Sequence, residues 1–90
     1  MATIKIPTPL RTYTQNQPEV KVAGSTVGEV LRALDVSYPG LGARLFDGQG
    51  ALRRYINVFH NDEDIRALAE LETKVVDADR LVIMPAIAGG

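Results

Sequence analysis

The C-terminal pair Gly89-Gly90 is the part of this 90-residue chain whose residue types are best suited to chemistry. Neither residue carries a side chain, so a tail that ends in them can pass through a tunnel too narrow for any Cβ atom and place its carboxylate inside a partner's active site. Adenylation by ATP would turn that carboxylate into an acyl group open to attack by a sulfur or nitrogen nucleophile. Considered alone, a diglycine is equally compatible with a frayed terminus.

The other residues capable of chemistry lack the partners that they would need. His60 is the single histidine and cysteine is absent, which excludes a two-histidine relay, a thiolate nucleophile and a Cys-ligated metal. His60 is therefore expected to be structural, and Asp62-Glu63-Asp64 a solvated turn, because the glycine and further oxygen ligands of a calcium loop are missing. Gly40-Leu41-Gly42 and Gly48-Gln49-Gly50 lack the third glycine of a nucleotide fingerprint. We expect no metal site, no stably bound cofactor and no enzyme activity of the chain's own.

Composition restricts the possible partners and location. The chain is 46% hydrophobic and 23% charged, which is typical of one small globular domain. Its formal charge of -1 lacks the broad basic field that nucleic-acid binding requires, so Arg53-Arg54 are expected to be plain surface residues. No apolar stretch approaches the roughly 20 residues of a membrane span, and residues 1–10 lack the order of a signal peptide. We expect a cytoplasmic protein that binds neither nucleic acid nor membranes.

Several segments have the periodicity of the elements that would position the tail. Residues 3–6 and 19–22 alternate polar and apolar, which predicts a strand hairpin with a long loop. Thr26 and Glu29 have the spacing of a capping box, and the helix that they start has an apolar face formed by Val27, Val30, Leu31, Leu34 and Tyr38. Pro39-Gly40 should end this helix. Further along we expect a helical turn at 41–46, strands at 55–60 and 80–84, and a short strand beginning at Ile65.

This order of elements predicts an α+β fold. One main helix would lie across a mixed sheet of about five strands, and the first and last strands would pair directly. Residues 1–85 would form the domain, and residues 86–90 a flexible tail ending in the diglycine.

With these elements the chain resembles the ubiquitin-like β-grasp sulfur carriers of the MoaD/ThiS type. The resemblance covers nearly the whole chain and rests on the opening strand with Ile4 and Ile6, on Thr26–Leu31, Tyr38–Leu41 and Tyr55–Val58, on Asn61–Asp64 and on the end Met84–Gly90. The chain departs from the family at Ala78, where glycine is usual, and at His60, where a small apolar residue is commoner. Neither departure lies in the tail.

The resemblance implies a β-grasp protein that is a substrate of enzymes and not itself one. A ubiquitin-activating-like adenylyltransferase would use ATP to adenylate the Gly90 carboxylate, which would become a thiocarboxylate, and Gly89 would give access. The stretch Asn61–Arg66 and the end Ala86–Gly90 look most like the cysteine-synthesis carrier. That carrier donates sulfur to a pyridoxal-phosphate synthase acting on O-phosphoserine, and a metallopeptidase then releases the new cysteine from the tail.

Other functions on the same scaffold stay open. The chain could be the small subunit of molybdopterin synthase or a thiamine-type sulfur carrier. It could also be a ubiquitin-like modifier whose Gly90 is joined to lysines of target proteins, with an amine as the nucleophile. A plain interaction domain with an inert terminus is a third possibility.

Strand alternation also predicts a surface on which partners dock. If Ile56 and Val58 face the helix, then Phe59 lies on the opposite side of the sheet, and Val82 and Met84 do so by the same rule. Together with Ile87 of the tail, these three residues are the expected partner-binding set. The alternative is a second small core beneath residues 41–54.

Overall fold

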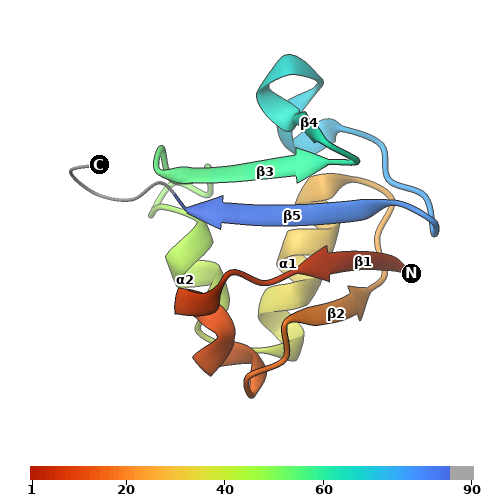
Figure 1. Cartoon of the computed structure of the whole chain (residues 1–90). Helices are drawn as coiled ribbons and strands as arrows, with labels where there is room; N and C mark the ends of the chain where they lie inside the picture. Colours follow the sequence, from red (N-terminus) through yellow and green to blue (C-terminus); the bar gives the residue numbers. More distant parts are fainter. Residues whose placement is uncertain (86–90) are drawn as a thin grey trace.

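The computed structural model describes residues 1–85, and a five-stranded mixed sheet runs through them (Figure 1). The strands lie in the order β2-β1-β5-β3-β4, with bounds β1 (Ala2–Lys5), β2 (Glu19–Val22), β3 (Ile56–His60), β4 (Glu63–Asp64) and β5 (Arg80–Pro85). β1 pairs in parallel with β5, and the other neighbours are antiparallel. The predicted α+β class and the direct pairing of first and last strands are confirmed. β5 is thereby the central strand.

Helices cover one face of this sheet. The main helix α1 (Val27–Ser37) crosses behind the strands, and the short helix α2 (Leu41–Leu45) follows it (Figure 1). Three 3-10 helices complete the described chain: η1 (Thr8–Thr14), η2 (Ile65–Ala67) and η3 (Glu70–Glu72). Within residues 1–85, no helix is both long enough and apolar enough to cross a membrane.

The start of α1 follows the predicted cap with one difference. The Thr26 side chain accepts a hydrogen bond from the Glu29 backbone N–H at 3.2 Å. The Glu29 carboxylate accepts from the N–H of Ser25 at 3.0 Å, not from that of Thr26 as the capping box predicts. These two hydrogen bonds satisfy two backbone donors next to the helix start, as a capping box would, and they fix where the helix begins.

A single apolar core lies between α1 and the sheet. The predicted helix face is confirmed, because Val27, Val30, Leu31 and Leu34 are each 0% exposed. Tyr38 is only half-buried and lies just beyond the helix as its C-terminal cap. The sheet contributes alternate residues to this core, which are Ala2, Ile4, Val20, Val22, Ile56, Val58, Leu81 and Ile83. Leu41 and Leu45 of α2 belong to the same cluster, so the alternative of a second core beneath residues 41–54 is wrong.

Two local predictions need correction. Ile65 does not begin a strand: it starts η2, while the short strand is β4, which forms a hairpin with β3 through Asn61 and Asp62. The Asp64 carboxylate accepts from the N–H of Arg66 at 2.9 Å, and this local cap favours a helical turn over further extension. The loop after β1, expected to be irregular, contains η1, whose start carries a proline that is suited to a first helical turn.

Candidate functional site

The central strand β5 is the last described element before the predicted tail, residues 86–90. Pro85, the last described residue, ends β5 and is the Cα partner of Ile56 at the start of β3. The end of β5 lies at the same end of the molecule as η1 and α2 (Figure 1). The predicted reactive residues Gly89 and Gly90, and the predicted contact residue Ile87, lie outside the described residues. The described chain thus ends with a strand that pairs with β1 on one side and with β3 on the other.

The predicted partner-binding side chains share the face of the sheet opposite α1. Phe59 and Val82 are direct Cα partners across β3 and β5, and both are half-buried, while the inward residues Val58 and Ile83 are 1% exposed. Met84, two residues further along β5, is 51% exposed. The predicted alternation is confirmed, and it places an aromatic, a branched and a flexible apolar side chain on one outward surface.

A groove of about 440 Å³ lies next to this surface at the end of β5. Its lining is mostly apolar and includes Val82, Met84 and Pro85 from β5, Pro7 from the turn before η1, and the cations Lys5 and Arg11. Sequence reasoning missed Pro7 and Arg11 as members of this site. The signal that could have found them is the predicted pairing of the first and last strands, because it brings the chain after β1 beside the end of β5.

His60 lies at the other end of β5 and has a structural role. Its Nε2 atom is 2.7 Å from Oδ2 of Asp79, a carboxylate that also accepts from the side chain of Asn61 at 2.8 Å and from the backbone N–H of Val76 at 2.9 Å. These contacts tie the β3–β4 turn to the turn before β5. The hydrogen bond from the Val76 N–H, followed by those from Asn61 and His60, lowers the pKa of Asp79 to about 2.

This shift makes stability depend on pH in a predictable direction. The pKa of Asp79 is lower in the folded protein than the roughly 4 of an unfolded chain, so its stabilising effect is complete above about pH 5. The effect is lost as the pH falls towards about 2. Asp79→Asn should therefore lower the free energy of unfolding at neutral pH, and the gap to the wild type should narrow in acid. Urea unfolding curves recorded across this range measure the gap.

Asp77→Asn is the matched control, because the Asp77 side chain is 96% exposed and its contact is a surface pair with the N-terminus. Such pairs contribute little, so this variant should follow the wild type across the whole range. A gap for Asp79→Asn that stays constant with pH would contradict the assignment.

Among residues 1–85, no group of three or more His, Cys, Asp or Glu side chains is arranged to hold a metal ion. The described part of the site is thus an apolar surface with a groove beside it, at the end of the central strand.

The model of the ThiS family matches residues 4–90 of this chain. The chain belongs to the ThiS family. This ThiS-family chain is also 42% identical over 90 residues to the sulfur carrier protein CysO of Mycobacterium tuberculosis, which covers 98% of this chain and 97% of that protein. It is 36% identical over 66 residues to small archaeal modifier protein 3 of Haloferax volcanii, covering 73% of this chain and 71% of the modifier. The predicted membership is confirmed.

The fold agrees with that membership. A chain in the crystal structure of the Amycolatopsis orientalis BexX/CysO complex superposes on this ThiS-family chain with a TM-score of 0.93 and 43% sequence identity, and the match covers 100% of both chains. The predicted β-grasp fold is thereby confirmed. These named relatives are carrier and modifier proteins.

Proposed function

We propose that this chain is a sulfur carrier whose Gly90 carboxylate is adenylated, converted to a thiocarboxylate and used as a sulfur donor, with cysteine synthesis as the pathway. The observation that carries the proposal is the extent of the family match. It runs from residue 4 through residue 90 and so includes the terminal diglycine. The 42% identity to a sulfur carrier over 98% of the chain supports the same conclusion.

The chemistry requires a carboxylate from this chain and an active site from a partner. A carboxylate oxygen of Gly90 attacks the α-phosphorus of ATP, and pyrophosphate leaves. Sulfide then attacks the acyl carbon and expels AMP, which leaves a thiocarboxylate on Gly90. The partner is a ubiquitin-activating-like adenylyltransferase, which binds the ATP. Gly89 lets the backbone enter its active site because no Cβ atom obstructs the approach.

The thiocarboxylate next needs an acceptor. We propose a pyridoxal-phosphate synthase that acts on O-phosphoserine, followed by a metallopeptidase that releases the cysteine from the tail. The similarity to a CysO carrier supports this choice over the molybdopterin and thiamine pathways, which use the same thiocarboxylate. Since the first step consumes ATP, we place the carrier in the cytoplasm.

The outward apolar surface is the proposed docking site for these enzymes. Phe59, Val82 and Met84 lie beside the groove at the end of β5, and Ile87 would extend the apolar contact along the tail. Met84 gives such a surface the adaptability that several partners of different shape demand. Docking here holds the start of the tail at the partner's active site, so the carboxylate reacts at a high effective concentration.

The test is intact mass spectrometry after incubation with ATP, sulfide and the adenylyltransferase of the same organism. The full chain should gain the mass difference between one oxygen and one sulfur, localised to Gly90. A chain lacking Gly90 should gain nothing. Gly48→Ala is the matched control, because a Cβ atom added at Gly48 would meet nothing within 4 Å, and it should react like the wild type. A folded wild type that never gains this mass would refute the proposal.

A second candidate function is protein modification. The similarity to small archaeal modifier protein 3 favours it, since the same activated carboxylate can be joined to a lysine amine. Conjugation would appear in cell extracts as bands of higher mass that contain this chain and vanish when Gly90 is deleted. Sulfur loading without any such bands would support the carrier function and contradict protein modification.

A further inference from the structure

Positive and negative side chains are distributed unequally between the two ends of the folded molecule, although its formal net charge is only -1. Residues 5–14 and 38–55 together hold five Lys or Arg residues and one acid, Asp47. Residues 61–80 hold seven Asp or Glu residues and three bases. The first two segments include η1 and α2 at the end of β5, whereas residues 61–80 run along the other end and the β4 edge of the sheet (Figure 1). β5 thus runs from an acidic end to a basic end.

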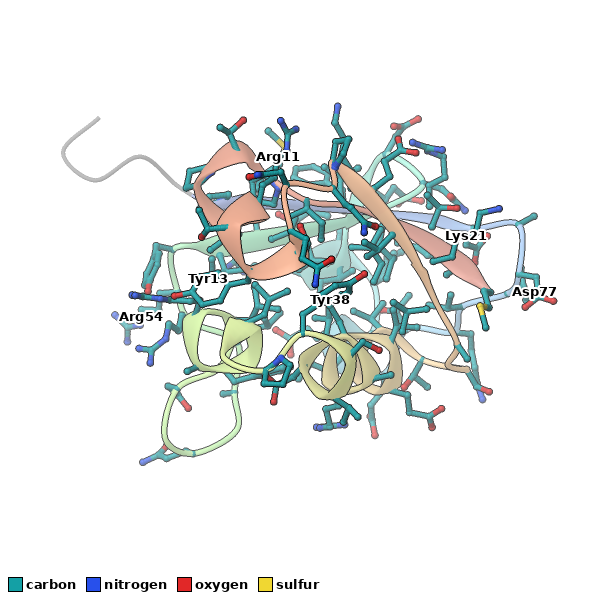
Figure 2. All side chains as sticks on the ribbon, turned by 90° about the horizontal axis from the view of Figure 1, so that it is seen from below. Arg11, Tyr13, Lys21, Tyr38, Arg54 and Asp77 are labelled. Atoms are coloured by element: carbon teal, nitrogen blue, oxygen red, sulfur yellow. The ribbon has the colours of Figure 1, made fainter. Side chains whose placement is uncertain are left out.

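The fold places the five bases of the first two segments at the end of the molecule where β5 finishes, with η1 and α2 (Figure 1). These bases are Lys5, Arg11, Arg44, Arg53 and Arg54. Lys5 and Arg11 line the same groove as Pro85. Arg54 lies two residues before Ile56, the Cα partner of Pro85. Figure 2 shows Arg11, Tyr13 and Arg54 towards the end where β5 finishes, with Lys21 and Asp77 on the opposite side. We call Lys5, Arg11, Arg44, Arg53 and Arg54 the tail-end basic cluster.

Neutral acceptors hold three members of this cluster in place. Arg44 Nε donates to the Tyr13 hydroxyl at 2.7 Å, and its guanidinium lies 5.8 Å from the centre of the Tyr13 ring. Arg11 Nε donates to the carbonyl of Ile6 at 3.0 Å and Arg53 Nε to that of Ala43 at 3.1 Å. Within residues 1–85, no member of the cluster forms a salt bridge.

We propose that the tail-end basic cluster steers this chain onto an acidic surface that surrounds the tail entrance of its adenylyltransferase. The inference rests on the proposed function, because that enzyme receives the tail. With a net charge of -1 the whole molecule is not drawn to an acidic partner, so any attraction comes from the distribution of charge. The basic end is attracted and the acidic end is repelled, which raises the encounter rate and selects the orientation in which the tail leads.

Arg54→Glu tests the proposal through the association rate constant, measured by stopped flow with the adenylyltransferase. Arg54 is exposed, and among residues 1–85 its side chain forms no salt bridge while its backbone carbonyl accepts from Arg66, so the fold should tolerate the change. At an ionic strength of about 0.01 M, where charges act over about 30 Å, association should slow about fivefold to tenfold. At about 1 M, where the range is about 3 Å, the variant and the wild type should converge.

Lys21→Glu is the matched control, since it makes the same change of charge at an exposed site on the opposite side of the molecule (Figure 2). Lys21→Glu should change the association rate constant by less than about twofold. Equal slowing by both variants, or wild-type association that is indifferent to salt, would overturn the proposal.

The mass assay at saturating adenylyltransferase separates this inference from the proposed function. Arg54→Glu should still gain the sulfur mass there, because steering affects encounter and not the chemical step. A wild type that gains sulfur but shows no dependence on salt would overturn the steering alone. A wild type that gains no sulfur would overturn both.

Discussion

Replacing Gly89 with valine should slow formation of the thiocarboxylate at least about hundredfold, even with saturating adenylyltransferase. The branched side chain would meet the walls of a site that accepts backbone alone, and displacement of a reacting atom by about 1 Å costs this much rate. Because the described core is built from residues between Ala2 and Ile83, we expect thermal unfolding to be unchanged. The rate is read from the mass gain over time.

Gly48→Val is the control for introducing a valine. Nothing lies within 4 Å of a Cβ atom placed at Gly48, so the side chain would extend into open space. Its loading rate should match that of the wild type. If Gly89→Val reacts as fast as this control, the tail does not enter a narrow site and the proposed role of Gly89 is wrong.

Truncating Leu31 to alanine should lower the free energy of unfolding by about 3 to 4 kcal/mol. Leu31 is 0% exposed on the face of α1 that packs against the sheet, so the truncation removes buried methyl groups and leaves a cavity that the neighbours fill only in part. For a small domain whose total stability is about 5–15 kcal/mol this is a large share. Urea unfolding at neutral pH measures the change.

Val36→Ala makes a truncation on the same helix for comparison. Val36 is 81% exposed, so its removal creates no cavity, and the change should stay within about 0.5 kcal/mol. A Leu31→Ala variant as stable as Val36→Ala would show that α1 does not depend on this face for its packing.

Local rules predicted the elements well because each rule acts over a few residues. The cap at Thr26 depends on Glu29, three positions later, and the inward side chains of β3 and β5 follow from alternation within a single strand. The error at Ile65 arose from a local competition, in which the Asp64 cap favoured a turn over extension. The 3-10 helix η1 was missed because a polar, proline-containing loop has no apolar period to reveal a turn of this kind.

The site itself was predictable only in part. The outward positions of Phe59, Val82 and Met84 followed from alternation, and the direct pairing of Phe59 with Val82 needed the strand register. The groove was not predictable in detail, because Pro7 and Arg11 join it from a segment more than 70 residues away from Pro85 in the sequence. No periodicity within one segment reports such a contact.

The sequence by itself determined the types and order of the main elements, the apolar face of α1, the diglycine end and the family resemblance. Each of these depends on residues that are close together along the chain or on the identity of the residues themselves. Only the tertiary structure decided that Arg11, Arg44 and Arg54 gather at the end of β5 while the acids of residues 61–80 lie elsewhere. The physical reason is that charge acts through space, so its distribution is set by the parallel pairing of β1 with β5 and by the packing of α2 beside η1.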